Sequence, residues 1–163
     1  MMIPVLTPAQ AREYEARAIT GGRSAQVLME VAGRHLADVA IAEFGAQADH
    51  GTLIACGSGN NGGDGWVTAR VMHRLGLSVW VTESAPPTNE PAATMRRLAL
   101  EDGVRLVDHD GPGPAVRLVI DALLGSGASG PLRGTVAAMA RRISEVHLPI
   151  VAADAPTGLD MAT

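Results

Sequence analysis

From residue 52 to the end of the chain, short apolar segments alternate with longer segments of helical spacing. The short segments are rich in β-branched residues and lack a clean apolar–polar alternation, which is typical of strands buried on both faces of a parallel sheet. This alternation predicts a doubly wound α/β fold with right-handed crossovers. We expect strands at 52–56, 78–82, 104–107, 117–121 and 148–153, and helices at 63–75, 90–101 and 134–145.

Two helices are expected before the first strand. Residues 7–10 have the capping-box pattern with proline at the first helical position, which predicts a helix to about Ile19. A second helix is expected over Ser24–Phe44, with Gly45 as its stop. The chain has the length of one domain, so we interpret residues 1–163 as a single Rossmann-like α/β/α domain with a mostly parallel sheet.

The composition excludes several classes of function. A net charge of −4 does not favour nucleic acid as a partner, and the lack of lysine excludes lysine-based catalysis. The single cysteine, Cys56, cannot form an internal disulfide or a cysteine-rich zinc site. The N-terminal residues lack a signal-peptide pattern, and no apolar segment has the length to span a bilayer. We therefore expect a cytoplasmic protein that does not bind membranes.

Residues 57–65 read Gly-Ser-Gly-Asn-Asn-Gly-Gly-Asp-Gly and directly follow the first expected strand. Glycines let backbone N–H groups approach a ligand closely, and the N-terminus of the helix expected next offers unpaired donors. The segment also fits Gly-x-Gly-x-x-Gly, with Glu83 near the place of a ribose-binding acid. An NAD(P)-dependent oxidoreductase is therefore one alternative. Asp64 opposes it, because its negative charge would repel a pyrophosphate at this helix N-terminus.

Three expected loops each carry an aspartate at or just beyond a strand end, namely Asp64, Asp121 and Asp154. With strand order 3-2-1-4-5, these loops meet at the carboxyl edge of the sheet, where open α/β sheets bind ligands. The three carboxylates repel one another unless a proton or a cation lies among them. Asn61 and Thr157 add neutral oxygens, and oxygen ligands without His or Cys suit a hard cation. The residues alone thus predict a small-molecule site that contains a hard metal ion.

Four ordered sequence blocks resemble the NAD(P)H-hydrate epimerase family, the YjeF N-terminal domain. Residues 57–65 match the family's Gly-x-Gly-Asn-Asn-Gly-Gly-Asp-Gly. Residues 121–127 match Asp-x-Leu-Leu-Gly-Thr-Gly except for Ser126, residues 154–159 match Asp-x-Pro-Ser-Gly-Leu except for Thr157, and residues 28–33 match Leu-Met-Glu-Asn-Ala-Gly except for Val31. The resemblance covers essentially the whole chain. Family domains usually continue some tens of residues beyond the third block, so we expect this domain to be short at its C-terminus.

The resemblance implies an isomerase of metabolite repair that interconverts the R and S forms of hydrated NADH and NADPH. It implies a potassium ion held by Asn61, Asp121 and Thr157, a homodimer, and a functional link to an ADP- or ATP-dependent dehydratase. The substrate contacts that it implies are Asn60, Asn61, Gly62, Gly63, Asp64, Gly125, Ser126, Gly127, Ala128, Ser129, Gly130, Pro131 and Asp154.

Inversion of the hydroxyl-bearing carbon requires proton transfer at that hydroxyl, and we assign Asp154 as the acid/base. Asp121 is expected mainly to hold the cation, and Asp64 to orient the loop or the substrate hydroxyls. A non-catalytic module of the same fold, which binds a ligand or RNA or mediates dimerisation, is the second alternative. The acidic residues and the negative net charge count against it, whereas the short C-terminus counts for it.

Overall fold

The fold is built on one parallel five-stranded sheet. The computed structural model describes residues 6–111 and 113–159. Most of the N-terminal segment that was compared with a signal peptide therefore lies outside the described residues. The strands are β1 (Thr52–Cys56), β2 (Val79–Glu83), β3 (Arg105–Leu106), β4 (Leu118–Ala122) and β5 (Ile150–Ala152), all parallel and in the order β3-β2-β1-β4-β5. This order is the predicted one, and it places the strand switch between β1 and β4.

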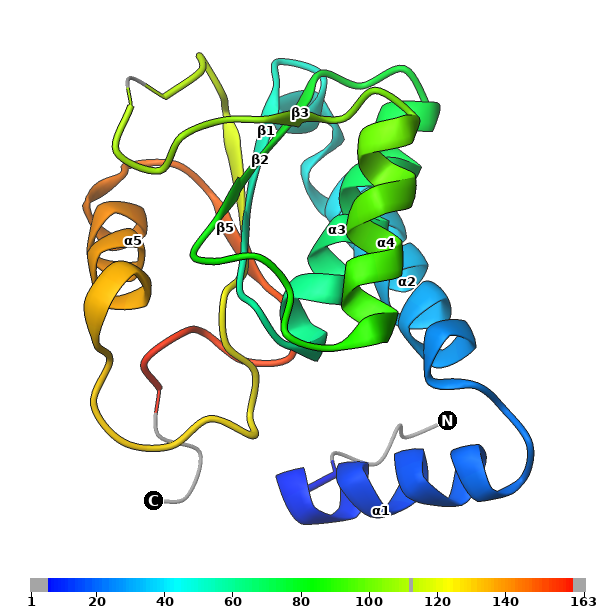
Figure 1. Cartoon of the computed structure of the whole chain (residues 1–163). Helices are drawn as coiled ribbons and strands as arrows, with labels where there is room; N and C mark the ends of the chain where they lie inside the picture. The colour runs from blue at the N-terminus through cyan, green and yellow to red at the C-terminus, as the bar shows by residue number, and fades with distance from the viewer. Residues whose placement is uncertain (1–5, 112, 160–163) are drawn as a thin grey trace.

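In the described part of the chain, four helices flank the sheet and a fifth lies apart from it. They are α1 (Pro8–Thr20), α2 (Ala25–Ala48), α3 (Asn60–Arg74), α4 (Glu90–Glu101) and α5 (Gly134–Glu145). Helices α2, α3 and α4 cover one face of the sheet and α5 lies on the other, whereas α1 stands apart at one end of the molecule (Figure 1). The predicted α/β/α architecture is therefore confirmed. Within the described residues, no helix combines the length and the apolar character needed to cross a membrane.

The helix boundaries agree with the sequence prediction at α1, α4 and α5 and differ at α2 and α3. Phe44 leaves helical geometry (φ −132°, ψ 30°), but the chain then resumes the helix to Ala48, so Gly45 is not its stop. Helix α3 begins at Asn60, three residues earlier than predicted, because Gly63 N–H bonds to Gly59 O at 3.1 Å. Most of the glycine-rich segment is therefore helix rather than loop.

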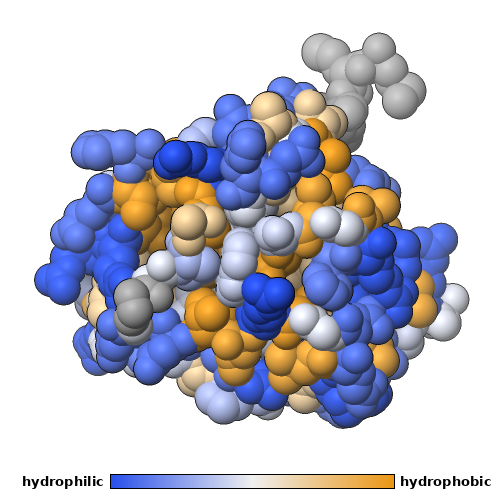
Figure 2. Space-filling model, turned by 90° about the horizontal axis from the view of Figure 1, so that it is seen from above, coloured by the Kyte–Doolittle hydropathy of each residue, from blue (hydrophilic) through white to orange (hydrophobic). Residues whose placement is uncertain are grey.

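The main core lies between the sheet and helices α2, α3 and α4. Trp66, Met72 and Ile54 are fully buried there, and Cys56 is buried among them. A smaller cluster packs the other face of the sheet against α5 through Met139. On the face seen from the end opposite α1, hydrophilic side chains occupy both flanks and apolar ones show between them (Figure 2).

Candidate active site

A cleft of about 570 Å³ lies at the carboxyl edge of the sheet, where the sequence predicted a site. Segments from five parts of the chain line it. They are Ala11, Arg12 and Glu15 of α1; Ala25, Leu28, Met29 and Ala32 of α2; Gly59, Asn60, Asn61 and Asp64 at the start of α3; residues 123–128 after β4; and Asp154 after β5. The predicted loops thus do meet, and two N-terminal helices join them.

The glycines inside the glycine-rich segment serve packing rather than the cleft. A Cβ on Gly62 would lie 1.8 Å from the carbonyl oxygen of Gly57, and one on Gly63 would lie 2.4 Å from Met29 Sδ. Both glycines are buried and neither lines the cleft, which differs from the substrate contacts expected of them. Their role is to let the first turn of α3 pack against the preceding loop and against α2.

Asp64 lies in the second turn of α3 and faces the cleft. Burial is the main cause that raises the pKa of Asp64 from 3.8 to about 7, and the charges of Glu15 and Asp154 add to it. Within residues 6–111 and 113–159 its carboxylate makes no ion pair and no hydrogen bond. The Asp64 carboxyl therefore holds its proton to a higher pH than an exposed aspartate does.

Asp154 is held in a precise orientation at the mouth of the cleft. Its φ of 62° is the one positive value among the described non-glycine residues, and aspartate tolerates this left-handed region better than most. The Ser126 N–H donates to Asp154 Oδ2 at 2.7 Å, which ties the loop after β5 to the loop after β4. A Cβ on Gly125 would lie 2.5 Å from the same oxygen, so this contact requires glycine there.

Asp121 lies beneath the cleft and does not line it, which differs from the expectation of three carboxylates in one crevice. It is only 5% exposed, and its carboxylate accepts hydrogen bonds from Thr157 N (2.8 Å), Thr157 Oγ1 (2.7 Å) and Leu123 N (3.2 Å). The Thr157 hydroxyl also accepts from Leu124 N at 3.1 Å. Asp121 and Thr157 therefore connect the loop after β4 to the loop after β5 beneath the cleft.

Asn61 is the third residue that the resemblance assigns to potassium. Among residues 6–111 and 113–159 its buried Nδ2 has no hydrogen-bond partner, and its Oδ1 lies 3.4 Å from the position of a Cβ on Gly125. No hydrogen bond joins Asn61 to Asp121 or Thr157 in the part of the chain that the structure describes. The three residues offer amide, carboxylate and hydroxyl oxygens, and Asp121 is a buried charge with no cationic side chain paired to it there. The oxygen atoms of this donor set fit a hard cation.

A second pocket of about 220 Å³ adjoins the cleft. Leu124, Gly125 and Ala128 line both, so the loop after β4 forms the wall between them. Of the substrate contacts implied by the resemblance, residues 129–131 lie in this second pocket and not in the main cleft. Arg133 at the start of α5 lines it as well.

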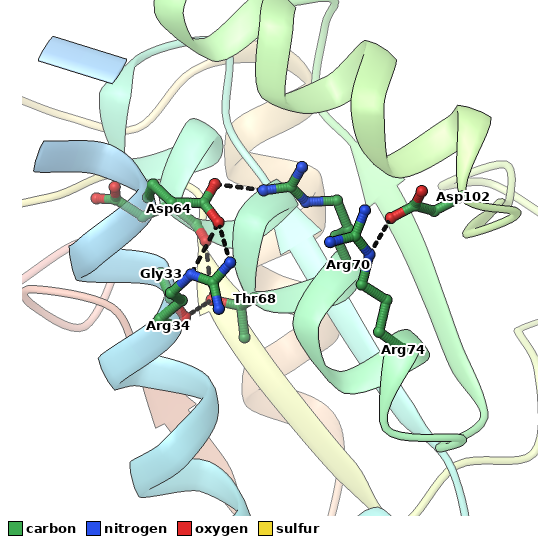
Figure 3. A network of polar contacts seen from close by, with 8 residues as sticks. Gly33, Arg34, Asp64, Thr68, Arg70, Arg74 and Asp102 are labelled. Carbon is green, nitrogen blue, oxygen red and sulfur yellow. Dashed lines mark hydrogen bonds and ion pairs between the residues drawn. The ribbon is translucent and has the colours of Figure 1, made fainter. Parts of the chain in front are cut away.

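A polar network fixes α2 against α3, the two helices that form one wall of the cleft. The Thr68 hydroxyl bonds to Gly33 O at 3.0 Å and to Asp64 O at 2.8 Å, and Figure 3 shows these contacts beside Arg70. Arg70 is 7% exposed and forms an ion pair with Glu30 of α2. The Thr68 hydrogen bond helps to position the backbone of Asp64. Glu30, the glutamate of the Leu-Met-Glu block, contributes by holding α2 against α3 through its ion pair with Arg70.

Sequence reasoning missed Arg12 and Glu15, which α1 brings to the cleft. They stand three residues apart and therefore on one helix face, but nothing in the sequence indicates where α1 docks. Glu83, the candidate ribose-binding acid, accepts from Arg96 with both oxygens at 2.8 Å. That ion pair occupies the carboxylate that a nicotinamide-dependent oxidoreductase would need.

The fold and the site define a Rossmann-like α/β protein with an acidic ligand cleft at the carboxyl edge of its sheet. A family model described as "YjeF-related protein N-terminus" matches residues 25–163, and the chain belongs to this family.

Named relatives agree with this assignment. The chain is 34% identical to an NAD(P)H-hydrate epimerase of Rhodopirellula baltica over 98% of its own length and 68% of that protein. It is 28% identical to an NAD(P)H-hydrate epimerase of Limosilactobacillus fermentum, over 97% and 76% of the two chains. A bifunctional NAD(P)H-hydrate repair enzyme of Thermanaerovibrio acidaminovorans is 35% identical over 97% of this chain, which spans 32% of that enzyme. The crystal structure of the yeast protein ynu0 (YNL200c) superposes with a TM-score of 0.86 at 25% identity, over 97% of this chain and 72% of the yeast chain.

Proposed function

We propose that this protein epimerises hydrated NADH and NADPH. The observation that carries the proposal is the cleft itself, which brings Asn60, Asn61 and Asp64 of the first block next to the Gly125 loop and Asp154. Two relatives that this chain matches over 68% and 76% of their own lengths are named NAD(P)H-hydrate epimerases. The volume of about 570 Å³ is that of a small-molecule site, and it has room for the hydrated nicotinamide riboside end of such a substrate.

The substrate carbon that inverts carries a hydroxyl and the ring nitrogen. Its configuration is lost either when the hydroxyl leaves as water to give an iminium ion or when the ring opens to an aldehyde. Both routes move a proton at that hydroxyl, so both need a positioned acid/base. Asp154 is our candidate, because the Ser126 N–H and the left-handed backbone fix its carboxylate at the cleft. No redox cofactor takes part, since the nicotinamide is itself the substrate.

A potassium ion is the cofactor that we propose, with Asn61, Asp121 and Thr157 as its protein ligands. The side-chain oxygen of Asn61, which lies beside Gly125, and the buried charge of Asp121 support this assignment. The ion would supply positive charge beneath an acidic cleft. The protein residues themselves anchor the two loops, since Thr157 bonds to Asp121 and to the backbone of Leu124.

The test is to incubate pure R-NADHX with the protein and to follow its conversion to the S form by chromatography, with potassium and with sodium. We expect conversion to be accelerated by the wild-type protein, and more so in potassium. Asp154→Asn should abolish the acceleration while the far-ultraviolet circular dichroism spectrum stays unchanged. Asp38→Asn is the matched control, because Asp38 is an exposed aspartate on α2 outside the cleft.

Full activity of Asp154→Asn would refute the role of Asp154. Absence of acceleration by the wild-type protein would refute the epimerase and leave the non-catalytic module of the same fold. Equal rates in potassium and sodium would refute the cation assignment alone. Relatives named bifunctional NAD(P)H-hydrate repair enzymes support a further proposal, a functional link to the ADP- or ATP-dependent dehydratase that the resemblance implies.

A further inference from the structure

The second pocket, described above, has an electrostatic character opposite to that of the main cleft. The charged side chains that line the main cleft are Arg12, Glu15, Asp64 and Asp154, a net negative set. The side chain of Arg133 is the one charge among the described residues that line the second pocket. The Arg133 guanidinium is exposed, and within the described chain it makes no ion pair and no hydrogen bond.

The substrate of the proposed reaction also has two parts that differ in charge. Its hydrated ring is neutral and must meet an acid/base, whereas its pyrophosphate carries two negative charges. A pyrophosphate among the carboxylates of the main cleft would be repelled, and the same group beside an unpaired guanidinium would be attracted. Leu124, Gly125 and Ala128 line both pockets, so the two pockets are neighbours that lie on either side of this loop.

We propose that Arg133 binds the pyrophosphate of the substrate in the second pocket, while the hydrated ring lies in the acidic cleft on the other side of the Gly125 loop. This inference rests on the proposed function. It assigns to Arg133 a binding role that none of the sequence blocks includes, since the second block ends at Gly127. The proposal also explains why residues 129–131, which the resemblance implies as substrate contacts, line the second pocket and not the cleft.

The first experiment measures binding without catalysis, with ADP-ribose as the probe. ADP-ribose carries the same pyrophosphate but no nicotinamide ring, and isothermal titration calorimetry gives its dissociation constant. Arg133→Gln should raise this constant about tenfold, the usual loss for one charge-assisted contact. The matched control is Arg141→Gln, because Arg141 is an exposed arginine of the same helix outside the pocket, and it should leave the constant unchanged.

The second experiment measures kinetics with both substrates. Arg133→Gln should raise KM for NADHX and NADPHX by similar factors and leave kcat nearly unchanged, because the contact is remote from the reacting carbon. The difference between the variant and the wild-type protein should shrink as salt is added.

Three results would overturn the inference. One is an ADP-ribose affinity that Arg133→Gln leaves unchanged. Another is a loss of affinity on Arg12→Gln instead, which would place the pyrophosphate in the main cleft. The third is a KM effect confined to NADPHX, which would place Arg133 at the extra phosphate of that substrate. If the wild-type protein binds ADP-ribose through Arg133 but does not epimerise, then the proposed function fails and the pyrophosphate site stands.

Discussion

Replacement of Asp64 by asparagine should remove a large part of the pH dependence of folding stability. Burial raises the pKa of Asp64 from 3.8 in the unfolded chain to about 7 in the folded protein, with help from Glu15 and Asp154. An acid whose pKa is higher in the folded state holds its proton more tightly when folded. The free energy of unfolding therefore falls as the pH rises through this interval. The asparagine side chain cannot ionise, so the variant lacks this decline.

The magnitude follows from the shift of about three pKa units at 1.36 kcal/mol per unit. The destabilisation by the buried carboxylate is absent below about pH 3.8 and reaches about 4 kcal/mol above pH 7. Between pH 5 and pH 8 the contribution of Asp64 changes by about 2 to 3 kcal/mol. This is a large fraction of the total stability of a small domain.

The assay is urea unfolding at pH 5 and pH 8 for the wild-type protein, Asp64→Asn and Asp38→Asn. The quantity of interest is the change in unfolding free energy between the two pH values, because titrating groups that do not interact with Asp64 contribute equally to all three proteins. The wild-type protein and Asp38→Asn should lose about 2 to 3 kcal/mol more than Asp64→Asn on going to pH 8. Parallel losses in all three would show that Asp64 titrates normally, and the argument from burial would be refuted.

Three further substitutions test packing and hydrogen bonds by thermal and urea unfolding. Thr157→Ala removes the hydroxyl that donates to buried Asp121 and should cost about 1 to 3 kcal/mol, whereas Thr157→Ser should restore most of it. Gly62→Ala places a Cβ 1.8 Å from a backbone carbonyl oxygen and should cost about 3 kcal/mol or more; a stable variant would contradict the packing role. Glu30→Gln leaves the buried Arg70 guanidinium without its ion pair and should cost about 3 kcal/mol, and a neutral effect would show that the pair contributes nothing.

The sheet could be predicted from the sequence because apolar runs and helical segments alternate regularly from residue 52. The strand order and the helices at 90–101 and 134–145 agree with the structure. The start of α3 could not be predicted from the sequence, because glycine has a poor helix propensity and a glycine-rich segment predicts a loop. Packing overrides this propensity, because the missing side chains of Gly62 and Gly63 let α3 approach the neighbouring loop and α2.

The candidate site was predictable only in part. The loops that follow the strands were expected to meet, and the Ser126–Asp154 hydrogen bond shows that two of them do. Asp121 was expected at the end of a strand over 117–121 and facing the same crevice. It is the fourth residue of β4, one residue before the strand ends, and its carboxylate bonds beneath the cleft. The contribution of α1 could not be predicted, because a helix set apart from the sheet has no strand register to fix its position.

The glycine-rich segment resolves into two faces once the start of α3 is known. In an α-helix, residues i and i+4 share a face, so Asn60 and Asp64 point the same way and Asn61 lies next to them. All three line the cleft, whereas Gly62 and Gly63 between them are buried in contacts too close for any side chain. The glycines therefore allow the helix to begin here, and the polar residues are carried into the cleft as a consequence. Asp64 accordingly lies one turn inside the helix and not at its tip, where its charge would have opposed a phosphate.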